Sequence, residues 1–156
     1  MGSDPDVGRG ARHAEHVVAV PKLDGVLETS LYVDDLERAA RFYGDVLGLK
    51  ALTSDARFRA YDVGGRSVLL IFRRGFTLET VHMPGGTIPP HDGHGPVHLA
   101  FSIAAAERET WESRLNEAGI AIEGRTRWPR GGESIYFRDP DGHLLELATP
   151  GLWPGY

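Results

Sequence analysis

Three side chains able to bind a divalent metal ion occur in two similar strand-like segments of the chain. The segment VLETSLYV, which begins at Val26, returns in the second half as PVHLAFSI, and Glu28 of the first copy stands where the second has His98. A third candidate, Glu146, lies in the apolar run HLLELA that closes the second copy. Carboxylate oxygens and imidazole nitrogens suit hard or borderline divalent ions, so these residues predict a shared metal site.

The alternation of side chains along each strand places the three candidates on one face of a sheet. In the segment 97–103 the odd positions are bulky and apolar and should face a helix layer, which leaves His98 on the opposite face. Glu28 stands opposite the apolar set of its own strand, and Glu146 is flanked by two leucines. A mostly buried carboxylate costs several kcal/mol unless a cation pairs with it. A metal would remove that cost, and water or arginine at the rim of the sheet is the alternative.

The residues around these candidates predict the same order of elements twice. In the first copy a strand is followed by a helix that starts at Asp34 as N-cap and ends at Gly48, because an aspartate suits the N-cap and a glycine the C′ position. In the second copy Gly119 ends the helix. The expected strands are 27–33, 49–53, 58–63 and 67–72, then 97–103, 120–123, 134–138 and 144–148, with the second helix at 105–118. The fold class is therefore α+β, with two β-α-β-β-β modules.

The expected domain is flanked by tails and divided by a long connector. Residues 1–22 are expected to be a flexible tail, whose His13 and His16 are solvated rather than metal-bound, and residues 151–156 a C-terminal tail. The single domain covers 23–150, with module one at 24–76, a connector at 77–95 and module two at 96–150. The connector lacks periodicity and is either a functional loop or a plain link; its histidines 82, 91 and 94 are solvated or supply a general base.

Composition excludes several classes of protein. A chain of 156 residues is long enough for one domain and too short for two ordinary ones. Its net charge of −5 makes nucleic acid an unlikely partner, and the absence of cysteine excludes disulfides and thiolate metal sites. No apolar stretch long enough to cross a bilayer and no secretion signal is evident, so we expect a cytoplasmic protein without membrane contact.

Further residues are candidates for substrate contacts. Arg130, in the loop RTRWPRGGES, could bind a substrate carboxylate or phosphate, or could simply be solvated. Tyr32, on the same face as Glu28, could line the pocket together with Tyr136, although aromatic residues in such places often serve packing alone. His143 alternates away from Glu146 and is expected to be exposed.

The chain resembles the vicinal oxygen chelate superfamily, which includes glyoxalase I, extradiol dioxygenases, fosfomycin-resistance thiol transferases and bleomycin-binding proteins. The similar stretches are ETSLYVDDLERAARFYGDVLGL, GPVHLAFSI and SIYFRDPDGHLLELATP, and the resemblance spans about residues 24–150. It implies a curved, mixed-sheet cup with helices on its outer face, often completed by dimerisation, with Glu28, His98 and Glu146 at ligand positions. Two departures stand out: Glu28 replaces the more usual histidine or glutamine, and the fourth ligand position falls in the apolar run 68–71.

The resemblance and the charges together predict a metal-dependent enzyme. One imidazole and two carboxylates leave positions open for substrate oxygens, which suits Lewis-acid or oxygen-activating chemistry. The second carboxylate favours Fe²⁺ or Mn²⁺, with Zn²⁺ and Ni²⁺ also possible, and a metal-bound Glu28 or Glu146 could accept a proton as the catalytic base. A small oxygen-bearing substrate and a homodimer are expected, with lyase, dioxygenase and transferase reactions all open. The alternative is a metal-free protein of the bleomycin-resistance type that sequesters an antibiotic or toxin.

Overall fold

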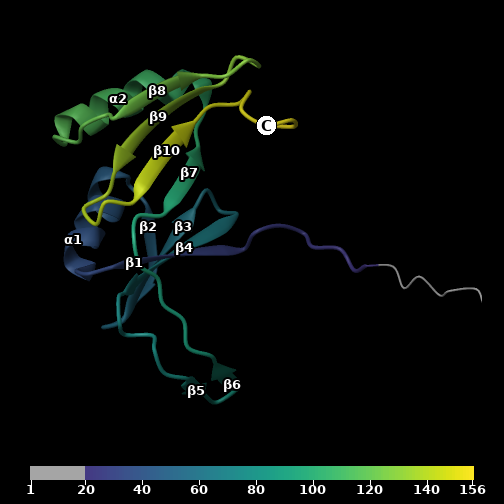
Figure 1. Ribbon diagram of the computed structural model, residues 1–156, viewed down its shortest axis with the longest axis vertical. Helices are drawn as coiled ribbons and strands as arrows, with labels where there is room; N and C mark the ends of the chain where they lie inside the picture. The colour runs from purple at the N-terminus through teal and green to yellow at the C-terminus, as the bar shows by residue number, and fades with distance from the viewer. Residues whose placement is uncertain (1–19) are drawn as a thin grey trace, which may run out of the picture.

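The computed structural model describes residues 20–156, which form two β-rich modules, one above the other in Figure 1. His13 and His16, and nearly all of the predicted tail 1–22, lie outside the described residues. Among residues 20–156 no helix is long and apolar enough to cross a membrane.

Module one contains a four-stranded sheet in the order β1-β4-β3-β2. Its elements are β1 (Glu28–Val33), α1 (Leu36–Ala40), the π-helix η1 (Arg41–Val46), β2 (Lys50–Ser54), β3 (Phe58–Val63) and β4 (Ser67–Arg73). The predicted N-cap Asp34 is wrong by one residue, because the Oδ1 atom of Asp35 accepts the helix-start hydrogen bonds from the backbone of Glu37 and Arg38. The backbone N–H of Asp34 instead donates to Asp141 of module two.

Module two repeats the arrangement, with the strand order β7-β10-β9-β8. Its elements are β7 (His98–Ser102), the 3₁₀ turn η2 (Ala105–Glu107), α2 (Arg108–Glu117), β8 (Gly124–Arg127), β9 (Glu133–Arg138) and β10 (Leu144–Ala148). The strand predicted at 120–123 is wrong, since the strand begins at Gly124. Ile120 and Ile122 pack against the core from the preceding loop, which explains their strand-like apolar spacing.

The two modules share their register as well as their order of elements. Strands β1 and β4 are parallel with Glu28 opposite Val68, and β7 and β10 are parallel with His98 opposite Leu144. By this correspondence Leu70 of β4 occupies the place of Glu146 in β10. The predicted α+β class with two β-α-β-β-β modules is confirmed. Among the described residues the two four-stranded sheets are separate, so one chain supplies two halves rather than one continuous sheet.

The connector contains a small hairpin that the sequence did not predict. Strands β5 (Val81–Met83) and β6 (Gly86–Ile88) pair antiparallel and project below module one in Figure 1. Each strand is only three residues long, too short for the alternation that identifies a strand.

The C-terminal residues fold back onto module two, where the hydroxyl of Tyr156 donates to the carbonyl oxygen of Ala148.

One hydrophobic core joins the modules on the helix side of both sheets. Figure 1 shows α1 next to the turn between β9 and β10, and the following η1 carries Phe42 and Tyr43 into this junction. Phe42 packs near Phe137 with ring centroids 6.3 Å apart, and the hydroxyl of Tyr43 donates to Asp139 at 2.7 Å. Burial and the neighbouring charge of Asp139 raise the pKa of Tyr43 far above its usual value, so it remains a hydrogen-bond donor.

His143 is a second connection between the modules, and the prediction that it is exposed was wrong. Its side chain is only 2% exposed. The ring Nδ1 accepts from the backbone N–H of Val97 at 3.1 Å, so Nε2 carries the proton and donates to the carbonyl oxygen of Tyr32 at 2.9 Å. Alternation correctly turned His143 away from Glu146, but the space on that side is filled by module one rather than by solvent.

Candidate functional site

Two of the three predicted metal ligands meet on module two. His98 on β7 and Glu146 on the adjacent β10 lie with His98 Nε2 3.1 Å from Glu146 Oε2. The side chain of His98 is half exposed, whereas Glu146 is only 4% exposed. The alternation predicted for β7 is observed, because Leu99 and Phe101 pack against the core on the opposite face. We call these two residues the His98–Glu146 pair.

The hydrogen bonds of His98 place its Nε2 atom against a carboxylate oxygen. His98 Nδ1 lies 2.9 Å from the carbonyl oxygen of Leu144, which can only accept, so Nδ1 carries a proton. In neutral imidazole Nε2 is then an acceptor, and it faces the acceptor oxygen of Glu146. Two acceptors at this distance require a proton or a cation between them. Metal-binding histidines characteristically donate their other N–H to a carbonyl or carboxylate in this way, so the pair fits a divalent ion.

A chain of hydrogen bonds fixes the carboxylate of Glu146 from behind. The hydroxyl of Ser134 donates to Glu146 Oε1, and Trp128 Nε1–H donates to the Ser134 oxygen at 2.9 Å. Ser134 is only 1% exposed. Sequence reasoning missed Ser134, although its position two residues before Tyr136 on β9 places it on the same face of the sheet as Glu146.

Tyr136 lies next to Glu146 on the neighbouring strand β9, and its ring is close to that of His98. Tyr136 is the β9 partner of Glu146, and its ring centroid is 6.2 Å from that of His98. Burial, followed by the negative charge of Glu146, raises the pKa of Tyr136. Its hydroxyl therefore stays protonated at neutral pH and can donate to a substrate oxygen near the pair.

Glu28 lies elsewhere in the same chain. It starts β1 in the other sheet and lines a cavity of about 490 Å³ between that sheet and the connector, which we call the connector cavity. Tyr32 and His91 line the same cavity, so two residues named from sequence lie there with Glu28. Within the described part of the chain no group of three or more acidic or histidine side chains is placed to hold a metal ion. One chain thus brings His98 and Glu146 together without Glu28.

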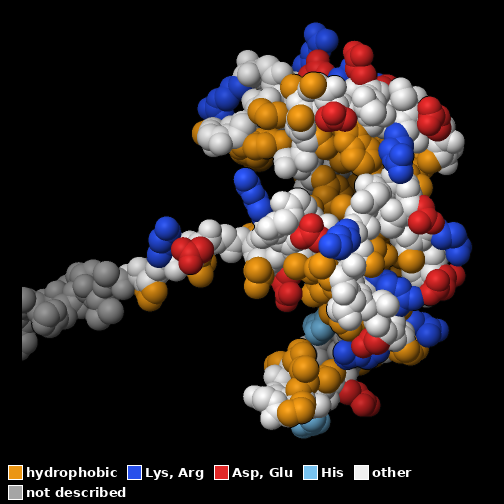
Figure 2. Space-filling view, turned by 180° about the vertical axis from the view of Figure 1, so that it is seen from behind, with side chains coloured by type: hydrophobic (Ala, Val, Ile, Leu, Met, Phe, Trp, Pro, Cys, Tyr) orange, Lys and Arg blue, Asp and Glu red, His pale blue; other side chains and the backbone are white. Residues whose placement is uncertain are grey.

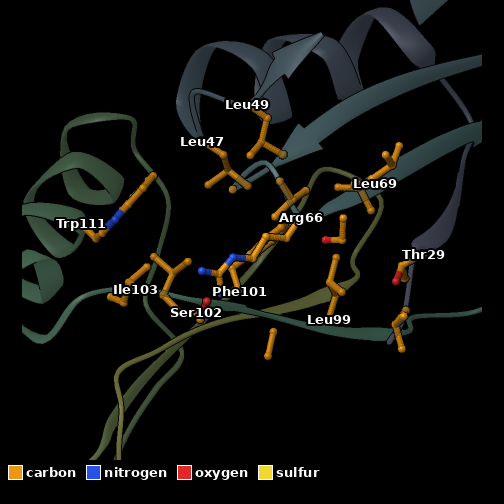
Figure 3. Close-up of a pocket in the computed structure, with 17 residues that line it drawn as sticks. Thr29, Leu47, Leu49, Arg66, Leu69, Leu99, Phe101, Ser102, Ile103 and Trp111 are labelled. Atoms are coloured by element: carbon orange, nitrogen blue, oxygen red, sulfur yellow. The ribbon is translucent and has the colours of Figure 1, made fainter. Parts of the chain in front are cut away.

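A second cavity, of about 620 Å³, separates the modules; we call it the intermodule cavity. Figure 3 shows Leu99, Phe101 and Ile103 on one side and Leu47, Leu49 and Leu69 on the other, with Arg66 reaching between them. In Figure 2 the surface is hollowed between the upper and lower parts of the molecule, and hydrophobic side chains line the hollow. In the described part of the chain, β1 and β7 are both edge strands of their sheets.

Arg130, which the sequence suggested as a substrate contact, lines neither cavity. Arg130 is exposed in the turn after β8 and is absent from the residues lining the connector and intermodule cavities. Its neighbours in sequence form surface ion pairs, Arg125 with Glu112 and Arg127 with Glu133. Of the connector histidines, His91 is part of a cavity wall, while His94 pairs with Asp92 at 3.5 Å on the surface.

Comparison with known proteins identifies the family. The chain is 36% identical over 118 residues to metallothiol transferase FosB of Staphylococcus saprophyticus, covering 75% of this chain and 71% of that protein. Among solved structures, lactoylglutathione lyase from Agrobacterium tumefaciens has a TM-score of 0.77 at 32% identity, covering 85% of this chain and 98% of that one. Fosfomycin resistance protein FosX from Mesorhizobium loti has a TM-score of 0.59 at 25% identity, covering 82% and 93%. The family profile matches residues 22–147, and the chain belongs to the Glyoxalase/Bleomycin resistance protein/Dioxygenase superfamily.

Proposed function

We propose that the chain is a metal-dependent enzyme that acts on a small oxygen-bearing substrate, with the His98–Glu146 pair as the core of its metal site. The observation that carries the proposal is the 3.1 Å distance from His98 Nε2 to a buried carboxylate oxygen of Glu146, with Nδ1 of the same ring held by the carbonyl oxygen of Leu144. A cation bound by both atoms would satisfy the pair and would polarise substrate oxygens at its open positions. Fe²⁺ and Mn²⁺ suit the carboxylate-rich set best, with Zn²⁺ and Ni²⁺ as further possibilities.

The same proposal includes a second copy of the chain, whose Glu28 completes the metal site. Among residues 20–156, the edge strands β1 and β7 each leave one row of backbone groups without a strand partner. The segment that leads into β1 exposes Leu23, Val26 and Leu27 by 91%, 76% and 71%. A homodimer in which β1 of one copy lies along β7 of the other would bury these side chains and bring Glu28 to the pair. Glu28 could then also serve as a base.

The relatives narrow the reaction class. One is named a metallothiol transferase and another a lactoylglutathione lyase. Both names refer to thiol chemistry, so we place thiol transfer and the lyase reaction ahead of dioxygenation. In either case Tyr136 is positioned to donate a proton or hydrogen bond to a substrate oxygen beside Glu146. Assays for thiol transfer and for lactoylglutathione formation, run on the protein loaded with each ion, distinguish the two.

Metal binding by the pair is tested directly by equilibrium dialysis. Metal-free protein should take up one Mn²⁺, Fe²⁺, Zn²⁺ or Ni²⁺ per site, and His98→Ala and Glu146→Ala should each abolish saturable uptake. His94→Ala removes a histidine from another histidine–carboxylate pair, at the surface, and should bind like the parent. If the parent takes up no stoichiometric ion, His98 and Glu146 form an imidazolium–carboxylate pair and the proposal fails.

The contribution of Glu28 across a dimer has its own test. Chains carrying Glu28→Ala and His98→Ala are coexpressed with different tags, and the heterodimer is purified. If the site joins two chains, one of the two sites in that heterodimer regains every ligand, whereas each homodimer has none intact. Recovery of metal uptake in the heterodimer alone supports the shared site. No recovery, or a monomer by analytical ultracentrifugation, overturns the dimeric arrangement.

A metal-free binding protein is the second candidate. The aromatic side chains of the connector cavity favour it, because they would hold an apolar ligand without any ion. Binding of a small molecule by a protein that takes up no stoichiometric divalent ion in the dialysis experiment would support this function over the enzyme.

A further inference from the structure

The floor of the connector cavity is a row of three aromatic rings. Phe58 of β3, Phe72 of β4 and Tyr32 of β1 lie side by side across the sheet. The centroids of Phe58 and Phe72 are 5.5 Å apart with planes inclined by 29°, and those of Phe72 and Tyr32 are 5.9 Å apart with planes inclined by 24°. The three rings form an aromatic row on adjacent strands, and the His91 ring of the connector packs edge-on against it, with its centroid 4.7 Å from that of Phe72. The three rings lie on the sheet face opposite the hydrophobic core, whose residues include none of the three.

The equivalent surface of module two carries no such rings. The shared register places Ser134 at the position of Phe58, Ala148 at that of Phe72 and Ser102 at that of Tyr32. All three equivalents are small. The module fold therefore does not require large side chains at these positions, and the aromatic floor is a feature of module one that needs its own explanation.

The connector forms the roof of the cavity and holds it in place. Val81, Ile88 and Pro89 line the roof. Arg74 donates to the carbonyl oxygen of Gly93 at 3.2 Å and to that of Tyr32 at 3.0 Å, which ties the end of the connector to β1. A methyl group on Gly93 would lie 2.5 Å from the Tyr32 ring, so roof and floor are in close contact here. The connector and module one are therefore held together at this end of the cavity by direct contacts.

One end of the cavity is polar but not cationic. The hydroxyl of Tyr32 lies 2.6 Å from His91 Nδ1. Burial and the charge of Asp92 raise the pKa of Tyr32, so the phenol keeps its proton and donates it to Nδ1. His91 Nε2 then carries a proton to donate, and the Tyr32 oxygen can accept. The charged residues of the lining are Glu28, Glu79 and Arg57, a balance that disfavours an anion.

We propose that the connector cavity binds an uncharged planar aromatic ring that bears a hydroxyl or carbonyl group. The ring lies against Phe58 and Phe72, and its polar group meets Tyr32 and His91. A volume of about 490 Å³ is within the range of small-molecule sites. The inference that this ring belongs to the enzyme's substrate rests on the proposed function, because it requires Glu28 in the cavity wall to be a ligand of the proposed metal site. The binding itself requires only module one and the connector.

The test follows p-fluorophenol by fluorine NMR in metal-free, full-length protein. The probe should bind saturably, and phenol should displace it at a lower concentration than cyclohexanol, which has the same hydroxyl on a non-planar ring. Phe72→Leu should weaken binding by roughly three- to tenfold, the equivalent of one aromatic contact. Phe76→Leu makes the same change at an exposed phenylalanine outside the cavity and should leave binding unchanged. Because Phe72 is buried, Phe58→Leu repeats the test at a less buried ring if Phe72→Leu fails to fold.

Three results would overturn the inference: no saturable binding, equal displacement by phenol and cyclohexanol, or parental affinity in both folded leucine variants. Metal uptake is measured on the same preparations, so the two proposals fail separately. Aromatic binding without metal uptake leaves the cavity assignment standing and removes the metal enzyme. Metal uptake without aromatic binding does the reverse.

Discussion

Replacing Ser134 by alanine tests whether the hydrogen bonds behind Glu146 prepare it for a cation. The substitution removes the hydroxyl that donates to Glu146 Oε1 and accepts from Trp128 Nε1. Alanine is smaller by one oxygen atom, so the 1%-exposed site is not overfilled. Glu146 keeps its contact with His98 but loses the donor that fixes the orientation of its carboxylate.

The size of the effect follows from the charge on the acceptor. A hydrogen bond to a charged group contributes about 1.5–3 kcal/mol, and about 1.4 kcal/mol corresponds to a factor of ten in affinity. Ser134→Ala should therefore weaken divalent-ion binding roughly ten- to hundredfold, the range found for partners behind metal ligands. Trp128→Phe leaves the bond from Ser134 to Glu146 intact and removes only the indole donor, so its effect should be smaller.

Isothermal titration of metal-free protein with Mn²⁺ or Zn²⁺ gives the comparison. Ser113→Ala, a matched change on the exposed side of α2, should bind the ion like the parent. Thermal unfolding of each variant separates a loss of ligand geometry from a loss of fold. If Ser134→Ala binds the ion within about twofold of the parent while remaining folded, Glu146 does not depend on this chain of hydrogen bonds, and the reasoning about the site is wrong.

Three further changes probe other parts of the structure. His143→Ala should lower the free energy of unfolding by about 2–4 kcal/mol, measured by urea denaturation, because a buried ring and two hydrogen bonds between the modules are lost; a loss below 0.5 kcal/mol, as at surface sites, would contradict this. Gly93→Ala should displace the Tyr32 ring and weaken p-fluorophenol binding while leaving metal uptake unchanged; parental probe affinity would refute the close packing. In an ultraviolet pH titration Tyr136 should ionise above its usual pKa, and Glu146→Gln should shift that pKa down because the carboxylate charge is removed; an upward shift would contradict the assignment.

The sequence predicted elements well where side-chain alternation alone decides them. The faces of β7 were assigned correctly because bulky apolar residues occupy every second position. Boundaries failed where contacts beyond the local pattern act. Asp34 and Asp35 are equally good N-caps by residue type, but Asp35 caps the helix, while Asp34 donates its backbone N–H to Asp141 and pairs its carboxylate with Arg74. His143 was placed on the correct side of its strand, but the neighbour that buries it comes from module one.

The sequence likewise predicted the part of the candidate site that depends on one module alone. His98 and Glu146 meet because β7 and β10 are adjacent parallel strands, which the order of elements within one module implies. The position of Glu28 depends on how two modules pair, and no pattern within either module encodes whether the pairing occurs in one chain or between two. Ser134 was overlooked because a serine in a strand carries no distinctive signal until its register against Glu146 is known.

The two copies of the module have diverged in complementary ways. Where module two has His98 and Glu146, module one has Glu28 and Leu70, so module one carries one potential metal donor and an apolar neighbour. Further along the same face, module one carries aromatic rings where module two carries serine and alanine. If β1 of one copy joins β7 of another, each cup combines a metal-binding wall from one chain with a ring-binding wall from its partner. Under that arrangement substitutions in the aromatic wall would change which substrate is held without altering the ligands from module two.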